Sequence, residues 1–185
     1  ISIRQGFEIT TFNELNNFIF NMKIFLIGYR CTGKTTLGKI LAHRLNFDFI
    51  DTDLLIEQSL GLTIRKIIEK QGWEKFRQIE KKTLLNTKKS NNTIIATGGG
   101  IIIDQDNQLF IKKNGLCVWL DADIKTIMTR LNTDNKTKTI RPALTNKDLF
   151  EETNEIVKKR NPLYKKIAHI KIDTSFNTPE EIVNI

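Results

Sequence analysis

The 185-residue sequence predicts an α/β protein in which helices cover both faces of a parallel sheet. Short apolar segments typical of buried strands alternate along the chain with longer segments of helical periodicity. Parallel strands joined in this way have right-handed crossovers. Three of the apolar segments are followed by residues suited to ligand binding, and folds of this class bind ligands beyond the C-terminal ends of their strands.

Five apolar segments have the length and composition of strands. The first, KIFLI, is mostly apolar and stops at Gly28, as expected for a strand that is buried on both faces. The others are also rich in β-branched and aromatic residues. We predict strands at residues 23–27, 47–50, 93–96, 116–120 and 169–172.

Helical spacing of apolar residues predicts helices at residues 34–45, 54–58, 63–70, 72–88, 105–112, 123–131 and 147–168. Pro162 lies inside the last of these, where it either interrupts intrahelical hydrogen bonding or begins a new segment. A final helix is expected after Thr178, because Thr178, Pro179 and Glu181 suit the N-cap, first and third helical positions.

Residues 1–21 stand apart from the alternating pattern. Apolar residues at helical spacing behind Thr11 predict a short amphipathic helix, which either packs on the following domain or links it to an upstream domain or partner. Residues 22–185 have the length of one domain, and we expect it to be a monomer. Residues 132–146 are polar and lack periodicity, which predicts a mobile loop.

The composition narrows the class of protein. Lys and Arg total 29 against 21 Asp and Glu, and the net charge of +8 favours anionic partners or a Lys-rich soluble surface. Two cysteines and two histidines provide neither a disulfide framework nor the spacing of a metal site, so a reducing, cytoplasmic compartment is expected. No segment has the pattern of a membrane helix or a signal peptide.

A phosphate-binding loop follows the first predicted strand and opens a predicted helix. Residues 28–35, GYRCTGKT, fit the pattern G-x-x-x-x-G-K-[ST], in which backbone N–H groups surround the phosphates. Lys34 would reach the β- and γ-phosphates, and the Thr35 hydroxyl would bind Mg²⁺. The predicted ATP-binding residues here are Gly28, Tyr29, Arg30, Cys31, Thr32, Gly33, Lys34, Thr35 and Thr36.

The phosphate loop alone does not define a reaction, because switch GTPases, ATP-driven machines and small-molecule kinases all use it. The chain lacks the guanine-reading motif of GTPases and is short for a mechanical ATPase. A compact kinase is therefore our first hypothesis.

Other polar residues stand at the ends of strands or on helices. Asp51 and Asp53 end the second strand, where one carboxylate would hold Mg²⁺-bound water and the other would accept a proton from a hydroxyl. Three glycines at residues 98–100 close the third strand and suggest a close backbone approach. Taken singly, these residues, like Arg77 and Arg160, are also compatible with turns, caps or surface charges.

Taken together and in order, these motifs resemble shikimate kinase from about residue 23 to residue 181. The matching features are the phosphate loop, Asp51-x-Asp53, Phe76-Arg77-x-x-Glu80, Gly98–Gly100, Arg141-Pro142 and Arg160-x-Pro162-Leu163-Tyr164. This sequence has Cys31 where the family usually has glycine, and its spacing from Arg130 to Arg141 is longer than in many members.

The resemblance implies a fold, a reaction and a cofactor. The fold is a three-layer P-loop kinase fold, similar to nucleoside-monophosphate kinases, with a central five-stranded parallel sheet and a mobile lid at about residues 132–146. The reaction transfers the γ-phosphoryl group of ATP, with Mg²⁺, to the 3-hydroxyl of shikimate in aromatic amino-acid biosynthesis. ATP and shikimate are then the expected partners, and neither nucleic acid nor membrane is expected.

The resemblance also implies residue roles. Asp53 would bind the shikimate hydroxyls and act as base, and Arg77 and Arg160 would grip the carboxylate. Gly98, Gly99 and Gly100 would offer backbone contacts, and Asp51 would be the Mg²⁺-associated acid beside Thr35. Arg141 would act with Lys34 on the transferring phosphoryl group, and Arg130 would lie against the adenine.

Three alternatives remain open at this point. A kinase for another small hydroxy acid, such as gluconate, would use a similar substrate site. A catalytically silent ATP-binding regulatory module would keep the phosphate loop but would not need Arg141. A nucleic-acid binder would rest on the net charge alone.

Overall fold

The computed structural model describes residues 22–133 and 148–184. The predicted N-terminal helix, Arg141 and nearly all of the predicted lid lie outside these residues. Asn132 and Thr133, at the start of the predicted lid, form the end of a helix instead. Within the described ranges, no helix is both long enough and apolar enough to cross a membrane.

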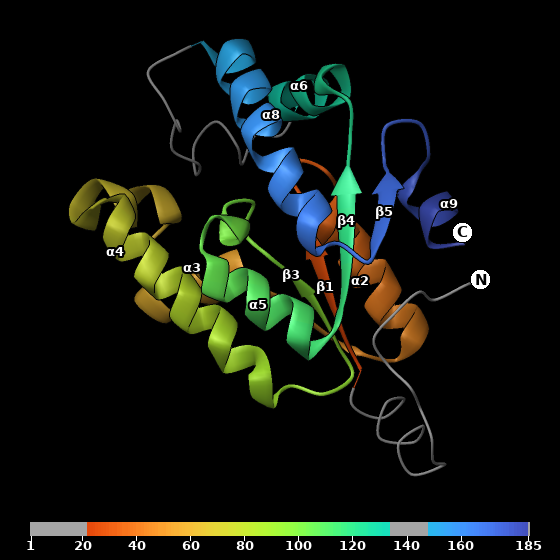
Figure 1. Cartoon of the computed structure of the whole chain (residues 1–185), viewed down its shortest axis with the longest axis horizontal. Coiled ribbons are helices and arrows are strands. Elements are labelled where there is room, and N and C mark those ends of the chain that lie inside the picture. The colour runs from red at the N-terminus through yellow and green to blue at the C-terminus, as the bar shows by residue number, and fades with distance from the viewer. Residues whose placement is uncertain (1–21, 134–147, 185) are drawn as a thin grey trace.

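Five parallel strands form a single sheet in the order β2-β3-β1-β4-β5 (Figure 1). They are β1 (Lys23–Ile27), β2 (Asp48–Asp51), β3 (Thr93–Ala96), β4 (Leu116–Asp121) and β5 (Ile170–Asp173). Every residue of the central β1 is buried, whereas the edge strands β2 and β5 are partly exposed. This pattern confirms the predicted α/β class with a five-stranded parallel sheet.

Helices follow the strands as the periodicity predicts, with ends that differ by a few residues. They are α2 (Lys34–Leu45), α3 (Thr52–Leu60), α4 (Ile64–Asn86), α5 (Gln105–Asn114), α6 (Ile124–Thr133), α8 (Leu149–Ile167) and α9 (Pro179–Val183), with short 3₁₀ turns η1 (Thr87–Lys89) and η2 (Ile101–Ile103). Asp51, Thr63, Asp104, Asp148 and Thr178 cap helix N-termini through their side chains. The expected capping box at Thr178 and Glu181 is present.

The structure bears out the helix break predicted near residue 71. The two predicted segments are joined in α4 at a kink, where Gly72 has a non-helical backbone with a φ of 78° and a ψ of 168°. Of the two alternatives for Pro162, the first holds: α8 continues through Pro162, which lacks an N–H and so interrupts one intrahelical hydrogen bond. Pro162 is exposed, so the backbone carbonyl left without its intrahelical partner can hydrogen-bond to water.

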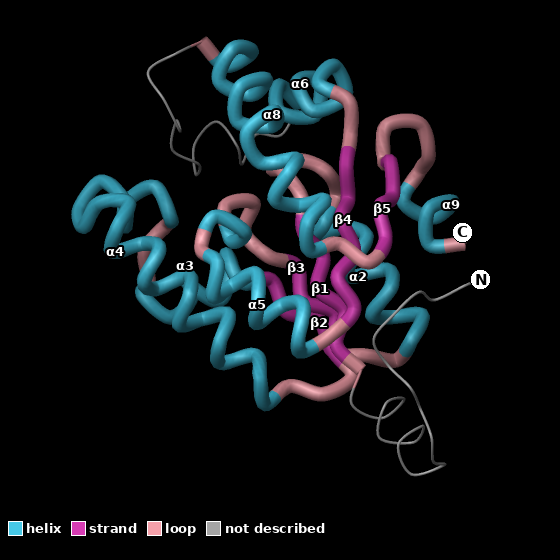
Figure 2. Tube along the Cα trace, viewed as in Figure 1, coloured by secondary structure: helices cyan, strands magenta, loops and turns pink. Residues whose placement is uncertain are grey.

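The sheet lies between two layers of helices (Figure 2). Alternate residues of a strand point to opposite faces, so Phe25 and Ile27 of β1 face one layer, and Ile24 and Leu26 face the other. The first layer contributes Leu84, Ile111, Tyr164 and Ile167 from α4, α5 and α8. The second contributes Leu37, Ala42 and Ile182 from α2 and α9. The two apolar clusters hold the C-terminal ends of the strands in fixed positions.

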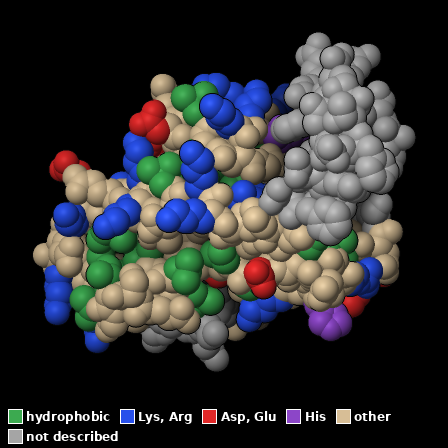
Figure 3. All heavy atoms as spheres, turned by 90° about the horizontal axis from the view of Figure 1, so that it is seen from below, with side chains coloured by type: hydrophobic (Ala, Val, Ile, Leu, Met, Phe, Trp, Pro, Cys, Tyr) green, Lys and Arg blue, Asp and Glu red, His purple; other side chains and the backbone are tan. Residues whose placement is uncertain are grey.

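Lys and Arg side chains are distributed over the described part of the face shown in Figure 3, with hydrophobic and uncharged surface between them. A nucleic-acid-binding face typically gathers its basic residues along one groove or helix. The basic residues on this face therefore do not by themselves indicate a nucleic-acid-binding site.

Candidate active site

The phosphate loop connects β1 to α2 at the C-terminal edge of the sheet. Gly28 has a φ of 141°, and a β-carbon there would overlap the carbonyl oxygen of Leu120. The Lys34 ammonium donates hydrogen bonds to the carbonyl oxygens of Gly28 (2.9 Å) and Tyr29 (2.6 Å). The Thr32 hydroxyl also donates to the Tyr29 carbonyl, at 2.9 Å. These bonds hold the loop curled around the buried Lys34 side chain, ahead of the N-terminus of α2.

Cys31 adopts a left-handed backbone conformation with a φ of 61°. This conformation costs a residue with a β-carbon about 1–2 kcal/mol and costs glycine almost nothing. The position at which the family usually has glycine is therefore one that favours glycine physically. The loop of this chain keeps the same left-handed turn at a local energetic cost.

Asp51 joins the phosphate loop to the end of β2. Its Oδ2 accepts a hydrogen bond from the Thr35 hydroxyl at 2.7 Å, and its Oδ1 accepts from the backbone N–H of Asp53 at 3.1 Å. One carboxylate thus caps α3 and also faces Thr35. Hydroxyl and carboxylate oxygens are the ligands that Mg²⁺ prefers, so the pair of Thr35 and Asp51 fits a magnesium site beside the phosphates.

The glycine turn after β3 lies against charged side chains. The backbone N–H of Gly98 donates to the Thr52 hydroxyl at 3.1 Å. A β-carbon on Gly98 would lie 2.7 Å from Oδ1 of Asp53 and 2.6 Å from Oε1 of Glu80. The predicted close approach at the glycines is therefore present, and at Gly98 the backbone passes close to the carboxylates of Asp53 and Glu80.

Arg77 is fixed from several sides. Its Nη1 lies 2.5 Å from Oε2 of Glu80, one helical turn further along α4. Its guanidinium carbon lies 5.2 Å from the ring centre of Trp73 and 5.3 Å from that of Phe76. On the remaining side lies the backbone of Gly100. Arg77 is therefore held in one orientation at the edge of the cleft.

Glu80 is a functional residue to which the sequence pattern assigned no role. It is 1% exposed and lies beside Arg77, whose Nη1 is 2.5 Å from its Oε2. Burial raises the pKa of the Glu80 carboxyl, and the guanidinium groups of Arg77 and Arg160 offset part of that rise. The spacing of Arg77 and Glu80, three residues apart on a helix, was the available signal.

Gly99 is held from the opposite side by α8. Its carbonyl oxygen accepts hydrogen bonds from Nη1 of Arg160 at 3.1 Å and from the Tyr164 hydroxyl at 2.5 Å. Tyr164 is fully buried, stacks on Trp119 with ring centres 5.8 Å apart, and has its pKa raised by burial. Tyr164 is a second residue to which the sequence pattern assigned no role, although it belongs to the motif Arg160-x-Pro162-Leu163-Tyr164.

A cleft of about 420 Å³ brings these elements together. Its walls include the phosphate loop, the carboxylates Asp51 and Asp53, the glycine turn, and both arginines expected to bind the substrate carboxylate. The structure therefore unites every predicted substrate-binding residue in one place. Arg141 lies outside the described residues.

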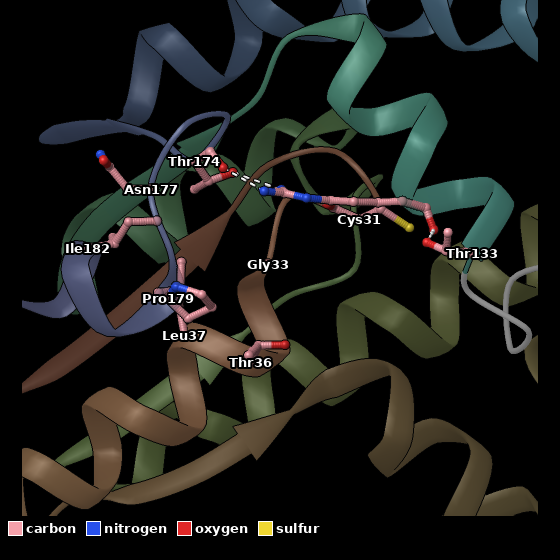
Figure 4. Close-up of a pocket in the computed structure, with 10 residues that line it drawn as sticks. Cys31, Gly33, Thr36, Leu37, Thr133, Thr174, Asn177, Pro179 and Ile182 are labelled. Atoms are coloured by element: carbon pink, nitrogen blue, oxygen red, sulfur yellow. Dashed lines mark hydrogen bonds between the residues drawn. The ribbon is translucent and has the colours of Figure 1, made fainter.

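A second pocket of about 410 Å³ adjoins the phosphate loop on the side of α9 (Figure 4). Arg130 of α6 lines it, with Nη1 donating to the carbonyl of Cys31 at 3.2 Å and Nη2 donating to the carbonyl of Thr174 at 2.5 Å. Leu37 and Pro179 give the pocket apolar walls. A pocket with apolar walls beside a phosphate loop, lined also by an arginine, suits a nucleotide base.

The fold and the site define a class of protein. The phosphate loop and the pair of Thr35 and Asp51 belong to P-loop phosphotransferases, and the facing cleft is sized for a small acceptor with a carboxylate and hydroxyl groups. The chain is thus a P-loop kinase of small molecules.

Comparison with known proteins identifies the family. The family model for shikimate kinase matches residues 30–185. The chain is 40% identical over 161 residues to shikimate kinase 2 of Escherichia coli O1:K1 / APEC, covering 87% of this chain and 91% of the relative. The chain therefore belongs to the shikimate kinase family, and shikimate kinase activity is the function that this membership indicates.

Solved structures agree with this assignment. The shikimate kinase from Acinetobacter baumannii in complex with shikimate superposes with a TM-score of 0.82 at 32% identity, covering 91% of this chain and 92% of that one. A gluconokinase from Sinorhizobium meliloti has a TM-score of 0.53 at 14% identity, covering 89% of each chain, which shows a shared fold alone. This likeness does not support the alternative that the chain is a gluconate kinase.

Proposed function

We propose that this protein transfers the γ-phosphoryl group of ATP to the 3-hydroxyl of shikimate, with Asp53 as the proton acceptor. One observation carries the proposal: Arg77 of α4 and Arg160 of α8 meet at the glycine turn, in the same cleft as Asp53 and the phosphate loop. Two guanidinium groups at one end of a cleft and a carboxylate near the phosphates suit an acceptor that has both a carboxylate and hydroxyl groups.

The nucleotide is bound on the side of β1 and α2. The backbone N–H groups of the loop and the ammonium of Lys34 bind the β- and γ-phosphates, and the base enters the pocket lined by Arg130. Thr35 and Asp51 would hold Mg²⁺, which would supply positive charge beside the phosphate oxygens. Bound phosphates would replace the two loop carbonyls as partners of Lys34.

The acceptor is bound on the side of α4 and α8. Arg77 and Arg160 bind the shikimate carboxylate, while Glu80 and the carbonyl of Gly99 hold the two guanidinium groups in position. Asp53 orients the reacting hydroxyl and takes its proton as the phosphoryl group arrives. Gly98 allows the backbone to pass close to this carboxylate. Arg141 would add positive charge at the phosphoryl group, as expected from the sequence.

A coupled assay of ADP release tests the proposal. Mg²⁺ and ATP are supplied with shikimate, gluconate, quinate or a nucleoside monophosphate, and Lys34→Met serves as the inactive control. The proposal predicts fast ADP release with shikimate and release near the water background with the others. Faster release with gluconate than with shikimate would contradict it. ATP binding without release for any acceptor would instead support the regulatory module.

A further inference from the structure

Arg30 stands at one of the x positions of the phosphate-loop motif and forms a buried ion pair with Glu152. Its Nη2 lies 2.5 Å from Oε1 of Glu152, and the two side chains are 11% and 2% exposed. Glu152 belongs to the first turn of α8, and its backbone N–H donates to the carbonyl of the N-cap residue, Asp148, at 2.9 Å. The pair therefore joins the phosphate loop to a helix that lies 122 positions further along the chain.

Stability alone does not explain this pair. Removing two charges from water costs several kcal/mol for each ion, and apolar residues of similar size usually stabilise such a site equally well or better. Apolar side chains lie next to the pair, because the neighbouring Tyr29 packs with Ile127, Ile156 and Val157 of α6 and α8. A buried arginine at this position therefore suggests a role for its charge.

The position of Arg30 indicates what that role is. Arg30 borders the same cleft as Lys34, Asp53 and Arg160. A β-carbon on Gly99 would lie 3.4 Å from the backbone nitrogen of Arg30, so the phosphate loop and the glycine turn touch at this point. In the proposed function, the phosphoryl group passes from nucleotide to acceptor across this junction.

The guanidinium of Arg30 has donors to offer there. Arginine has five N–H groups, and the ion pair with Glu152 involves Nη2. Its Nε is buried and has no hydrogen-bond partner among the described residues. The ion pair of Nη2 and the Tyr29 ring, whose centre lies 5.4 Å from the guanidinium carbon, hold Arg30 in place, and the Nε–H is left to donate to an anionic oxygen.

We propose that Arg30 is a further cation of the phosphoryl-transfer step and that Glu152 is the residue that positions it. The inference rests on the proposed function. Negative charge spreads over the oxygens of the transferring group, and a preorganised cation is most effective against such charge. Glu152 keeps the guanidinium oriented before the substrates arrive, so no reorganisation is needed during the reaction.

Steady-state kinetics of three variants test this inference. We expect Arg30→Met to lower kcat about 100-fold, because it removes a contact that strengthens in the transition state. We expect Glu152→Gln to lower kcat about 10-fold, because the guanidinium remains but is misplaced. The double variant Arg30→Met/Glu152→Gln should have the kcat of Arg30→Met alone, since Glu152 acts through Arg30. The KM for shikimate and the Kd for Mg²⁺-ATP should change less than about threefold.

Glu151→Gln is the matched control, because it removes one carboxylate from the exposed side of the same helical turn. It should retain the wild-type kcat. If Glu152→Gln fails to fold, the variant Arg30→Met/Glu152→Met replaces the whole pair by apolar groups of similar size. Circular dichroism melts identify the folded variants, and only these are compared.

The outcomes separate the possible failures. Wild-type kcat in Arg30→Met or in the double Met variant would overturn the role of Arg30, as would a defect confined to KM. A wild-type kcat in folded Glu152→Gln, or an equal loss in Glu151→Gln, would overturn the positioning role. If the wild-type protein itself does not phosphorylate shikimate, the proposed function fails and the inference fails with it.

Discussion

The guanidinium of Arg77 lies so close to the backbone of Gly100 that a β-carbon on Gly100 would come within 2.6 Å of its central carbon. The ion pair with Glu80 and the rings of Trp73 and Phe76 hold Arg77 against this glycine. The glycine turn therefore does more than leave room for a substrate. It also sets the position of an arginine that binds the substrate carboxylate in the proposed mechanism.

Gly100→Ala should displace Arg77 and raise the Kd for shikimate. The loss of a well-placed hydrogen bond to a charged group costs about 1.5–3 kcal/mol, or roughly 10- to 100-fold in affinity. The Kd for Mg²⁺-ATP should stay unchanged, because the phosphate loop is not touched. Titration calorimetry with each ligand measures both effects.

Gly61→Asn is the matched control for that substitution. Gly61 has a φ of 63°, a β-carbon at this position would have no heavy atom within 4 Å, and asparagine tolerates the left-handed conformation. Equal shikimate affinity in Gly100→Ala and in the control would show that Gly100 does not determine the position of Arg77.

Asp53→Asn should lower kcat by about 10²–10⁴-fold, because it removes the proton acceptor and keeps nearly the same shape. Binding of Mg²⁺-ATP should persist, since Asp51 and Thr35 remain in place. Asp48→Asn, an exposed change on β2, the strand before the helix that carries Asp53, is the control and should keep full activity. Turnover of Asp53→Asn near the wild-type rate would remove Asp53 from the mechanism.

Cys31→Gly should be more stable than Cys31→Ala by about 1–2 kcal/mol, because residue 31 has a left-handed backbone. Urea unfolding without nucleotide measures the difference in free energy. The same pair of substitutions at Lys39, an exposed position inside α2, should give the opposite order by about 1 kcal/mol. An alanine variant at residue 31 as stable as the glycine variant would mean that the left-handed turn is not retained.

His169 makes the stability of the β4–β5 edge depend on pH. Its Nδ1 accepts a hydrogen bond from the backbone N–H of Cys117 at 2.9 Å, which requires that nitrogen to be unprotonated. Burial, together with the charge of Lys112, lowers the pKa of His169 from its ordinary value of 6.5. The unfolded chain therefore takes up this proton at a higher pH than the folded chain does.

The stabilisation by His169 should be fully present above about pH 6.5 and should be lost as the pH falls through the lower folded-state pKa. Urea unfolding of the wild type and of His169→Gln between pH 7.5 and 5 measures this effect. The difference in unfolding free energy between the two proteins should shrink as the pH falls. A difference that grows at low pH would contradict the assignment of a neutral His169.

The sequence predicted the parts of the site that depend on local pattern. The phosphate loop, Asp51 and the glycine turn were found because each follows an apolar strand at the same edge of the sheet. The strands themselves were located to within one or two residues, because buried parallel strands are short runs of apolar residues.

The contacts that hold the site in shape depend on residues far apart in the chain. Tyr164 and Gly99 are separated by 65 positions, and Arg30 and Glu152 by 122. No local periodicity reports such pairs. Pro162 was ambiguous for a related reason, because the packing of α8 on the sheet, rather than local propensity, keeps that helix continuous.

The central claim is the transfer of phosphate to the 3-hydroxyl of shikimate, and identification of the product by phosphorus–proton correlation NMR tests it most directly. The protein is incubated with Mg²⁺, ATP and shikimate, and the new phosphomonoester is assigned through its coupling to a ring proton. We predict a single new signal, coupled to the proton on carbon 3, in an amount equal to the ADP formed. Phosphate on another hydroxyl, or ADP accompanied by inorganic phosphate alone, would contradict the proposed mechanism.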